Sequence, residues 1–163
     1  MYILVLPVLL SAGCKATVSF NGASIPDDVN TVSVEYFESQ APLTNPSFPQ
    51  IITEGLRDKF IRQTRLKLVT EDGDVQFKGA IITYGTSPVA ISGSETASLT
   101  RLTITVSVIF ENKYDDTQNF TQSFSRFADF DATQSLSAVE GTLMTEISEQ
   151  LVQDIFNRAF LNW

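Results

Sequence analysis

The sequence predicts an α+β fold: a two-layer α/β sandwich in which two helices cover one face of a mostly antiparallel or mixed sheet of about four to five strands. Residues 101–110 alternate between apolar and polar side chains, as a half-buried strand does. Residues 48–64 and 137–161 instead repeat apolar residues every three or four positions, which is typical of amphipathic helices. With 163 residues, the chain has the length of a single domain.

The first expected elements are a strand and a helix joined by a loop. Residues 31–38 alternate and predict the strand, and residues 39–47 contain two prolines and predict the loop. The helix begins at Ser47, which can cap it, and Gln50 can complete a capping box. We expect this helix to end near Thr64.

The middle of the chain predicts a hairpin. Residues 66–70 read as a strand, Asp72-Gly73 is a hairpin turn signal, and the returning strand runs from Val75 to about Tyr84. Residues 85–98 contain Gly, Ser and Pro and are expected to form a loop or an irregular edge.

A second pair of strands follows. The strand at 101–110 is joined by a turn at 112–117 to an antiparallel strand at 120–127. One face of this pair is aliphatic, and the opposite face is rich in hydroxyl groups and can remain wet. The hydroxyl groups belong to Thr103, Thr105, Ser107, Thr121, Ser123 and Ser125.

The last expected element is a long helix. Ser137 and Glu140 fit a capping box, and the helix can run to about Leu161. Its apolar face rotates toward the C-terminus, because steps of four residues turn it by about 40° each. Either the C-terminal turns lie deeper in the core or against the sheet edge, or they form an exposed apolar strip for a partner.

The N-terminus predicts an envelope protein. Residues 1–13 carry no charge, and their apolar run is too short for a membrane-spanning helix but suits a signal peptide. Small residues before Cys14 resemble a bacterial lipobox, in which the cysteine is acylated. We therefore expect a signal peptide at 1–13 with the true start upstream, a lipid anchor on Cys14, and a single domain at 14–163. The alternative is an uncleaved apolar strand with a chance cysteine.

Composition excludes several classes of function. There are 19 acidic and 11 basic residues, a net charge of −8, which argues against a nucleic-acid partner. The chain has no histidine and one cysteine, so histidine-based catalysis, CxxC zinc sites and internal disulfides are excluded. No nucleotide-binding motif is present, and the sequence predicts no catalytic residue, no metal and no cofactor.

One cluster of cations stands out in this acidic chain. Five of the eleven basic residues fall within eleven positions. They form either a solvated helix face or a corner that binds phosphates, such as those of an anionic glycolipid. The five residues are Arg57, Lys59, Arg62, Arg65 and Lys67.

Paired carboxylates are the remaining candidates for chemistry. They occur as Asp27/Asp28, Asp72/Asp74, Asp115/Asp116 and Asp129/Asp131, each at an expected turn. Turn aspartates usually bind their own backbone. A hydrolase of envelope glycans would need two of them, such as Asp129 and Asp131, to meet in one cleft.

Seven short segments, together with the cysteine signal, match the overall pattern of one known family. They are GASIP (22–26), VSVEYF (32–37), PL (42–43), ITEGLRDKF (52–60), RLTITV (101–106), FSRFADF (124–130) and DIFN (154–157). The chain thereby resembles the LptE type of lipopolysaccharide-assembly lipoprotein. This resemblance implies a small α/β sandwich, anchored through Cys14 to the periplasmic side of the outer membrane. It also implies two partners, an LptD-type β-barrel that the protein plugs or supports and lipopolysaccharide itself. An adaptor or activator of another envelope machine, such as a peptidoglycan synthase or a transporter, is the alternative, because fold does not fix function.

Overall fold

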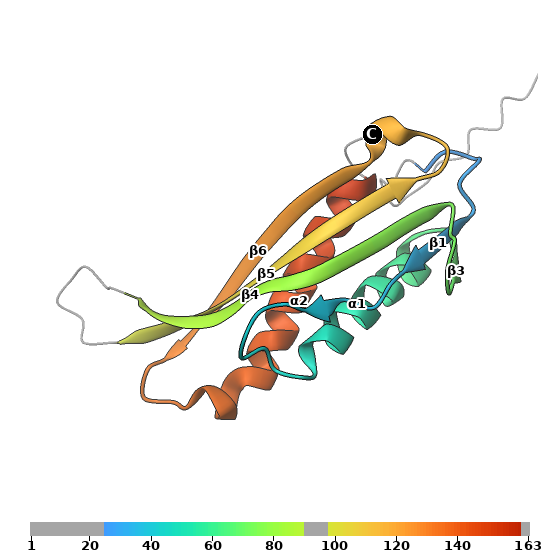
Figure 1. Ribbon diagram of the computed structural model, residues 1–163. Helices are drawn as coiled ribbons and strands as arrows, with labels where there is room; N and C mark the ends of the chain where they lie inside the picture. The colour runs from blue at the N-terminus through green and yellow to red at the C-terminus, as the bar shows by residue number, and fades with distance from the viewer. Residues whose placement is uncertain (1–24, 90–97, 161–163) are drawn as a thin grey trace, which may run out of the picture.

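The computed structural model describes residues 25–89 and 98–160, which form one sheet and two long helices (Figure 1). The expected signal peptide and Cys14 lie outside the described residues. In chain order the elements are β1 (Thr31–Val34), β2 (Glu38–Ser39), α1 (Phe48–Gln63), β3 (Lys67–Val69), β4 (Val75–Val89), β5 (Leu99–Asn112), the 3-10 helix η1 (Asp116–Gln118), β6 (Phe120–Asp131) and α2 (Leu136–Phe160).

The sheet is mixed, and its strands follow the order β3-β1-β4-β5-β6. β1 runs parallel to β3 and to β4, the short β2 also pairs with β4 in parallel, and β4, β5 and β6 are antiparallel. The α+β prediction is confirmed, with six strands in place of four to five because the predicted strand at 31–38 is present as two strands, β1 and β2. Both helices lie on one side of the sheet, as expected (Figure 1).

The predicted hairpin at Asp72-Gly73 is wrong. β3 and β4 do not pair with each other, because β1 lies between them. Both run parallel to β1, so the chain between them crosses from one side of β1 to the other, with Asp72 in the left-handed region at φ 56°. Gly73 then passes so close to β1 that a Cβ there would lie 2.4 Å from the backbone nitrogen of Ser33. Strand β1, buried between two neighbours, thus decides the topology of this half of the sheet.

The predicted strand at 31–38 is divided in two. β1 ends at Val34, and the chain bends before β2 begins at Glu38. The bend turns Phe37 into the core, where it has no exposed surface. Its backbone N–H donates to the hydroxyl of Thr53 on α1, at 3.1 Å, in place of a neighbouring strand.

The later strands are longer than the sequence predicts. β4 continues to Val89, so residues 85–89, expected as a loop or an irregular edge, are a regular strand, and residues 90–97 lie outside the described residues. β6 continues to Asp131 and includes Asp129, where a turn is expected. Both extensions follow from β5, which pairs without interruption from Phe110↔Phe120 to Leu99↔Asp131 on the β6 side.

Neither capping box forms. Ser47 is the N-cap of α1, but it has helical dihedral angles and makes no side-chain cap hydrogen bond; the side chain of Asn45 accepts from its N–H. α2 begins at Leu136, ahead of Ser137, so Glu140 lies inside the helix. The expected end of α1 is confirmed, with Thr64 as its C-cap; α2 is described up to Phe160, and its expected end near Leu161 lies outside the described residues.

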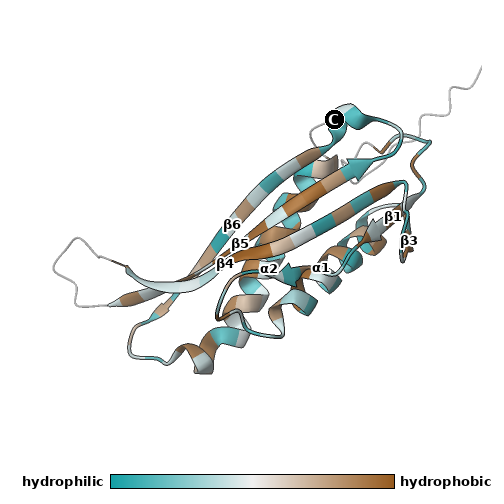
Figure 2. Cartoon of the chain, viewed as in Figure 1, coloured by the Kyte–Doolittle hydropathy of each residue, from teal (hydrophilic) through white to brown (hydrophobic). Residues whose placement is uncertain are grey.

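Aromatic side chains fill the core between the sheet and the helices. Ring centroids lie 4.8 Å apart for Phe60 and Phe77, 4.9 Å for Phe77 and Phe110, and 5.7 Å for Phe60 and Phe160. Phe156 and Phe160 on α2 are buried, so the C-terminal turns of α2 lie deep in the core and the alternative of an exposed strip is wrong. Bands of hydrophobic and hydrophilic residues alternate along β4, β5 and β6 (Figure 2).

Candidate functional site

The face of β4, β5 and β6 that points away from the helices, here called the open face, carries a ladder of hydroxyl groups. Thr121, Ser123 and Ser125 on β6 are exposed, which confirms the prediction of a wet hydroxyl face. Their partners on β5 are Ile109, Ser107 and Thr105, and Thr103 lies opposite Phe127; these β5 residues are half-buried or exposed. The hydroxyls of Thr105 and Ser125 lie 2.9 Å apart and form a hydrogen bond across the strands.

Three large apolar side chains interrupt the hydroxyl ladder. Ile82 and Ile109 are each 40% exposed and Phe127 is 47% exposed. A shallow depression of about 290 Å³ lies on this face, with both isoleucines in its lining. Apolar side chains set among hydroxyl groups suit a protein contact, because they can be buried without leaving charges unpaired.

Each end of the open face carries a neutralised charge cluster. Arg101 binds Asp129 through two hydrogen bonds of 2.7 and 2.8 Å, and its guanidinium lies 3.5 Å from the centre of the Phe127 ring. The hydrogen bond from Arg101 holds the pKa of the Asp129 carboxyl below its ordinary value. The paired guanidinium is therefore a fixed part of the surface.

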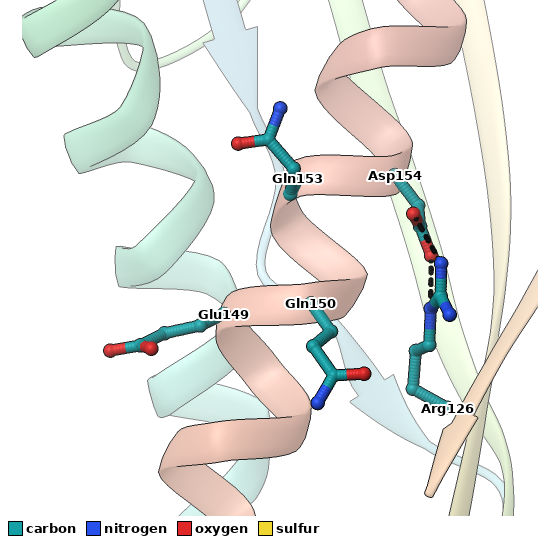
Figure 3. A pocket seen from close by; sticks show the side chains of 5 residues that line it. All are labelled: Arg126, Glu149, Gln150, Gln153 and Asp154. Atoms are coloured by element: carbon teal, nitrogen blue, oxygen red, sulfur yellow. Dashed lines mark hydrogen bonds and ion pairs between the residues drawn. The ribbon is translucent and has the colours of Figure 1, made fainter.

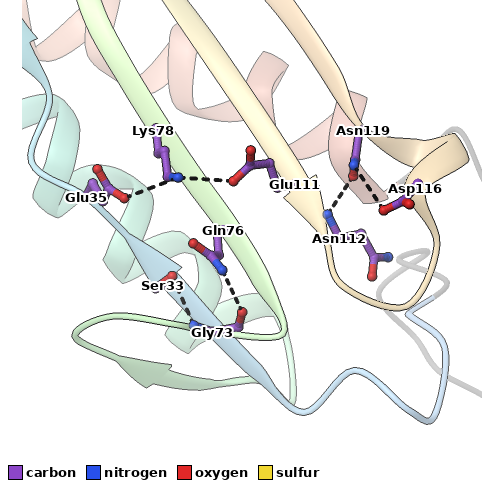
Figure 4. A network of polar contacts seen from close by, with 9 residues as sticks. All are labelled: Ser33, Glu35, Gly73, Gln76, Lys78, Glu111, Asn112, Asp116 and Asn119. Atoms are coloured by element: carbon purple, nitrogen blue, oxygen red, sulfur yellow. Dashed lines mark hydrogen bonds and ion pairs between the residues drawn. The ribbon is translucent and has the colours of Figure 1, made fainter.

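At the other end, Lys78 lies between two carboxylates (Figure 4). Its Nζ is 3.1 Å from Glu111 and 3.7 Å from Glu35, and the hydrogen bond to Glu111 contributes most to raising the pKa of Lys78. Since both cations are compensated, the open face as a whole offers little electrostatic attraction to an anion.

The structure does not gather the five predicted cations into one patch. On α1, Arg57 and Lys59 are two positions apart and therefore point in nearly opposite directions, about 160° from each other. Arg57 donates to the backbone oxygen of Val34 on β1, at 2.8 Å. Lys59 turns toward α2, where it lies over the ring of Phe156, and burial is the main cause that lowers its pKa.

The other three cations lie toward the end of α1 and beyond it. Arg62 pairs with Asp58 on the same helix at 3.5 Å. Arg65 reaches back to the chain before β1 and donates to the backbone oxygen of Pro26 at 2.7 Å. Lys67 is exposed at the start of the edge strand β3. Arg62 and Lys67 have no side-chain bond to another element among the described residues.

Several of the paired carboxylates have structural partners in the fold. Asp74 accepts from the backbone N–H groups of Asn30 and Thr31, both at 2.9 Å, and these bonds lower its pKa, with Asn30 the main cause. Asp131 accepts from Thr133, which lowers its pKa as well. Carboxyls with lowered pKa values are poor general acids at neutral pH, so these groups and the paired Asp129 do not support a hydrolase. No group of three metal-ligating side chains occurs within residues 25–89 and 98–160.

Two charged contacts of α2 were not predicted. Glu140 accepts a hydrogen bond from the hydroxyl of Tyr84 on β4. It also accepts one of 2.9 Å from the side-chain amide of Asn45. Burial is the main cause that raises the pKa of Tyr84. Further along α2, Asp154 binds Arg126 of β6 through two hydrogen bonds of 2.6 and 2.7 Å, beside a groove of about 350 Å³ (Figure 3). These contacts join residues that are distant in sequence, so no local pattern indicates them.

A family model described as "LptE: Lipopolysaccharide-assembly" matches residues 29–159, which is most of the chain. The chain belongs to the LptE family. It is thus a member of a family of lipopolysaccharide-assembly proteins, whose description names an assembly role and no catalytic one. A comparison with curated proteins finds no match.

Solved structures share this fold at low sequence identity. A minor lipoprotein from Acinetobacter baumannii matches with a TM-score of 0.52 and 12% identity, over 80% of this chain and 92% of that one. The rare lipoprotein B from Shewanella oneidensis matches with a TM-score of 0.51 and 16% identity, over 78% of this chain and 92% of that one. In the described part of this LptE-family chain, neither helix is both long and apolar enough to cross a membrane.

Proposed function

We propose that this LptE-family protein is anchored to the periplasmic side of the outer membrane and supports or plugs an LptD-type β-barrel that transports lipopolysaccharide. The observation that carries the proposal is the family match over residues 29–159. An open face of hydroxyl groups, three apolar side chains and neutralised charges agrees with it. The interior of a large outer-membrane barrel is polar, so such a face can contact its wall without an unpaired charge.

The proposed anchor is the acylated Cys14. Two or more acyl chains hold a protein at a membrane stably, whereas one short chain is marginal. A Cys14→Ala variant is expected to lose incorporation of a labelled fatty acid and to leave the membrane fraction. Retention of label in this variant would disprove the anchor.

Lipopolysaccharide is the second proposed partner, with Arg57, Lys59, Arg62, Arg65 and Lys67 as candidate contacts. Arg62 and Lys67 support it most, because their side chains are not used to hold another described element. Replacing both by Glu should weaken binding of purified lipopolysaccharide at least tenfold. The control is Arg57→Lys, which keeps the positive charge and should therefore leave binding of lipopolysaccharide unchanged.

The proposed partnership with a barrel is tested by purifying the acylated chain from detergent-solubilised outer membrane and identifying the proteins that come with it. A large β-barrel recovered at equal stoichiometry, together with loss of surface lipopolysaccharide on depletion, is the expected result. Recovery of a cell-wall synthase or a transporter in place of a barrel would favour the adaptor role and overturn the proposal.

A further inference from the structure

The outer edge of β6 has no strand beside it in the described part of the chain. Among the described strands, β6 is the last of the sheet and pairs on one side only, with β5. The N–H of Ala132 donates to the oxygen of Ser98 at 2.9 Å, in register with the β5–β6 ladder. Since residues in an antiparallel ladder alternate between the two sides, the even-numbered residues of β6 bond to β5. The odd-numbered residues therefore direct their N–H and C=O groups outward.

These outward groups have few partners in the described part of the chain. The oxygen of Asp131 accepts from the N–H of Gln134 in the turn before α2. For the five odd-numbered residues before it, no backbone hydrogen bond reaches the outer edge from residues 25–89 or 98–160. These five residues, here called the edge set, are Thr121, Ser123, Ser125, Phe127 and Asp129.

This edge lacks most of the features that usually prevent strand addition, and the one charged residue of the edge set, Asp129, is bound to Arg101. The register with β5 has no bulge over the whole strand, and β6 contains no proline. Natural edges are commonly short, bulged, or marked by charges and proline. Arg126 is the one cation on β6, and its side chain is bound to Asp154 on α2. By contrast, the opposite edge is the three-residue strand β3.

Side-chain contacts with α2 also hold β6 in place. The pair Arg126–Asp154 and the bond of 3.2 Å from Arg158 to Gln122 tie β6 to α2. Both β6 side chains belong to even-numbered residues, so the contacts with α2 leave the outward backbone groups of the edge set uncovered. A rigid, extended strand needs little ordering when another strand adds to it.

The charge of the surface around β6 indicates which kind of segment can add to its outer edge. Asp129 and Asp131 lie at one end of β6, where Asp131 is exposed and Asp129 is bound to Arg101. Together with the net charge of −8, this surface disfavours a second copy of the chain or an acidic segment. It accepts an uncharged or basic extended segment, whose backbone supplies the affinity.

We infer that the edge set of β6 binds an extended segment of the partner barrel, uncharged or basic, as an additional strand of the sheet. This inference rests on the proposed function for the identity of the partner. It goes beyond that function by assigning the contact to backbone hydrogen bonds along one edge. The added strand would then extend the open face beyond β6.

The test uses a matched pair of variants at Ser123, an exposed residue of the edge set whose side chain has no described hydrogen-bond partner. Ser123→Pro removes one outward N–H without removing a β5 bond, and Ser123→Ala removes the hydroxyl alone. We expect the proline variant of the full acylated chain to recover at least tenfold less barrel, with an unchanged melting temperature. The alanine variant should recover as much barrel as the wild type.

Amide hydrogen exchange on the wild type decides the case if the proline variant does not fold. In the free protein the even-numbered amides of β6 should be protected and those of the edge set should exchange quickly; in the complex the edge set should slow at least tenfold. Equal recovery by the proline and wild-type chains, or an edge set that stays fast in the complex, would overturn the inference while leaving the barrel as partner. Failure of the wild type to recover any barrel would instead reject the proposed function. Protection of the edge set through self-association, seen as a dimer without barrel, would overturn the assigned occupant.

Discussion

On the helix-covered face of the sheet, Phe77 has no exposed surface and contacts the rings of Phe60 and Phe110. On the open face of the same sheet, Phe127 is 47% exposed and contacts the guanidinium of Arg101. The same residue type thus contributes to the core on one face and to a contact surface on the other. The comparison teaches that stability and partner binding are separated by the two-residue repeat of the strands, so that either can be changed alone.

Truncating the two phenylalanines should give the largest contrast. Phe77→Ala removes a buried ring and leaves a cavity, so the free energy of unfolding should fall by about 3–5 kcal/mol. Phe127→Ala removes a ring that is half in water and should lower it by about 1 kcal/mol or less. Chemical denaturation of both variants measures the difference. Equal losses would mean that the open face is buried in the isolated protein.

Two glycines of β4 offer the next contrast. A Cβ at Gly79 would lie 2.3 Å from the buried ring of Phe37, whereas a Cβ at Gly85 would meet nothing within 4 Å. Gly79→Ala should therefore lower the free energy of unfolding by about 1–3 kcal/mol through overpacking. Gly85→Ala should be neutral or raise it by up to about 1 kcal/mol, because alanine restricts the unfolded chain. Thermal melts of the pair give the sign of each effect.

The carboxylate of Asp74 should give a smaller, pH-dependent effect. Hydrogen bonds from Asn30 and Thr31 lower its pKa in the folded protein. Its stabilisation is present above the unfolded pKa of about 3.9 and is lost as pH falls through the lower folded value. Asp74→Asn should lower the free energy of unfolding by about 1 kcal/mol at pH 7, allowing for screening by solvent. Below about pH 4 the difference from wild type should shrink. A constant difference across this range would contradict the assignment.

The smallest effect should come from the hydroxyl ladder. Ser107 is half-buried on the open face, and no hydrogen bond holds its hydroxyl group among the described residues. Ser107→Ala should change the free energy of unfolding by about 0.5 kcal/mol or less. Ser148→Ala on α2 is the comparison, since its buried hydroxyl donates to the backbone oxygen of Thr145 at 2.8 Å. A larger loss for Ser107 would show that the open face also stabilises the fold.

Patterns within single strands and helices predicted much of the fold. The alternation at 101–110 anticipated β5 and both of its faces, and the spacing of apolar residues anticipated the two helices and the end of α1. Predictions that needed a second segment were less successful. Asp72-Gly73 is a good local turn signal, yet β1 enters between the strands that it was expected to join. Ser137 and Glu140 have capping-box spacing, but Glu140 binds Tyr84 and Asn45.

The candidate site divides in the same way. The hydroxyl side chains of the open face were predicted, because the residue order along each strand sets which face they share. The dispersal of Arg57, Lys59 and Arg65 was not predicted. These cations are close in sequence, but their side chains point in different directions and contact different parts of the fold. The neutralising partners of Arg101 and Lys78 also lie on other strands or beside them.

The sequence by itself determined the α+β class, the two helices, the hydroxyl face and the resemblance to the LptE family, since each of these rests on local order along the chain. Only the tertiary structure decided the position of β1 between β3 and β4, the separation of the basic residues and the position of β6 at the outer edge of the described sheet. The physical reason is that strand pairing and ion pairing depend on which distant segments meet. Their selection depends on packing the whole core, in which Phe37 and Phe77 have no exposed surface.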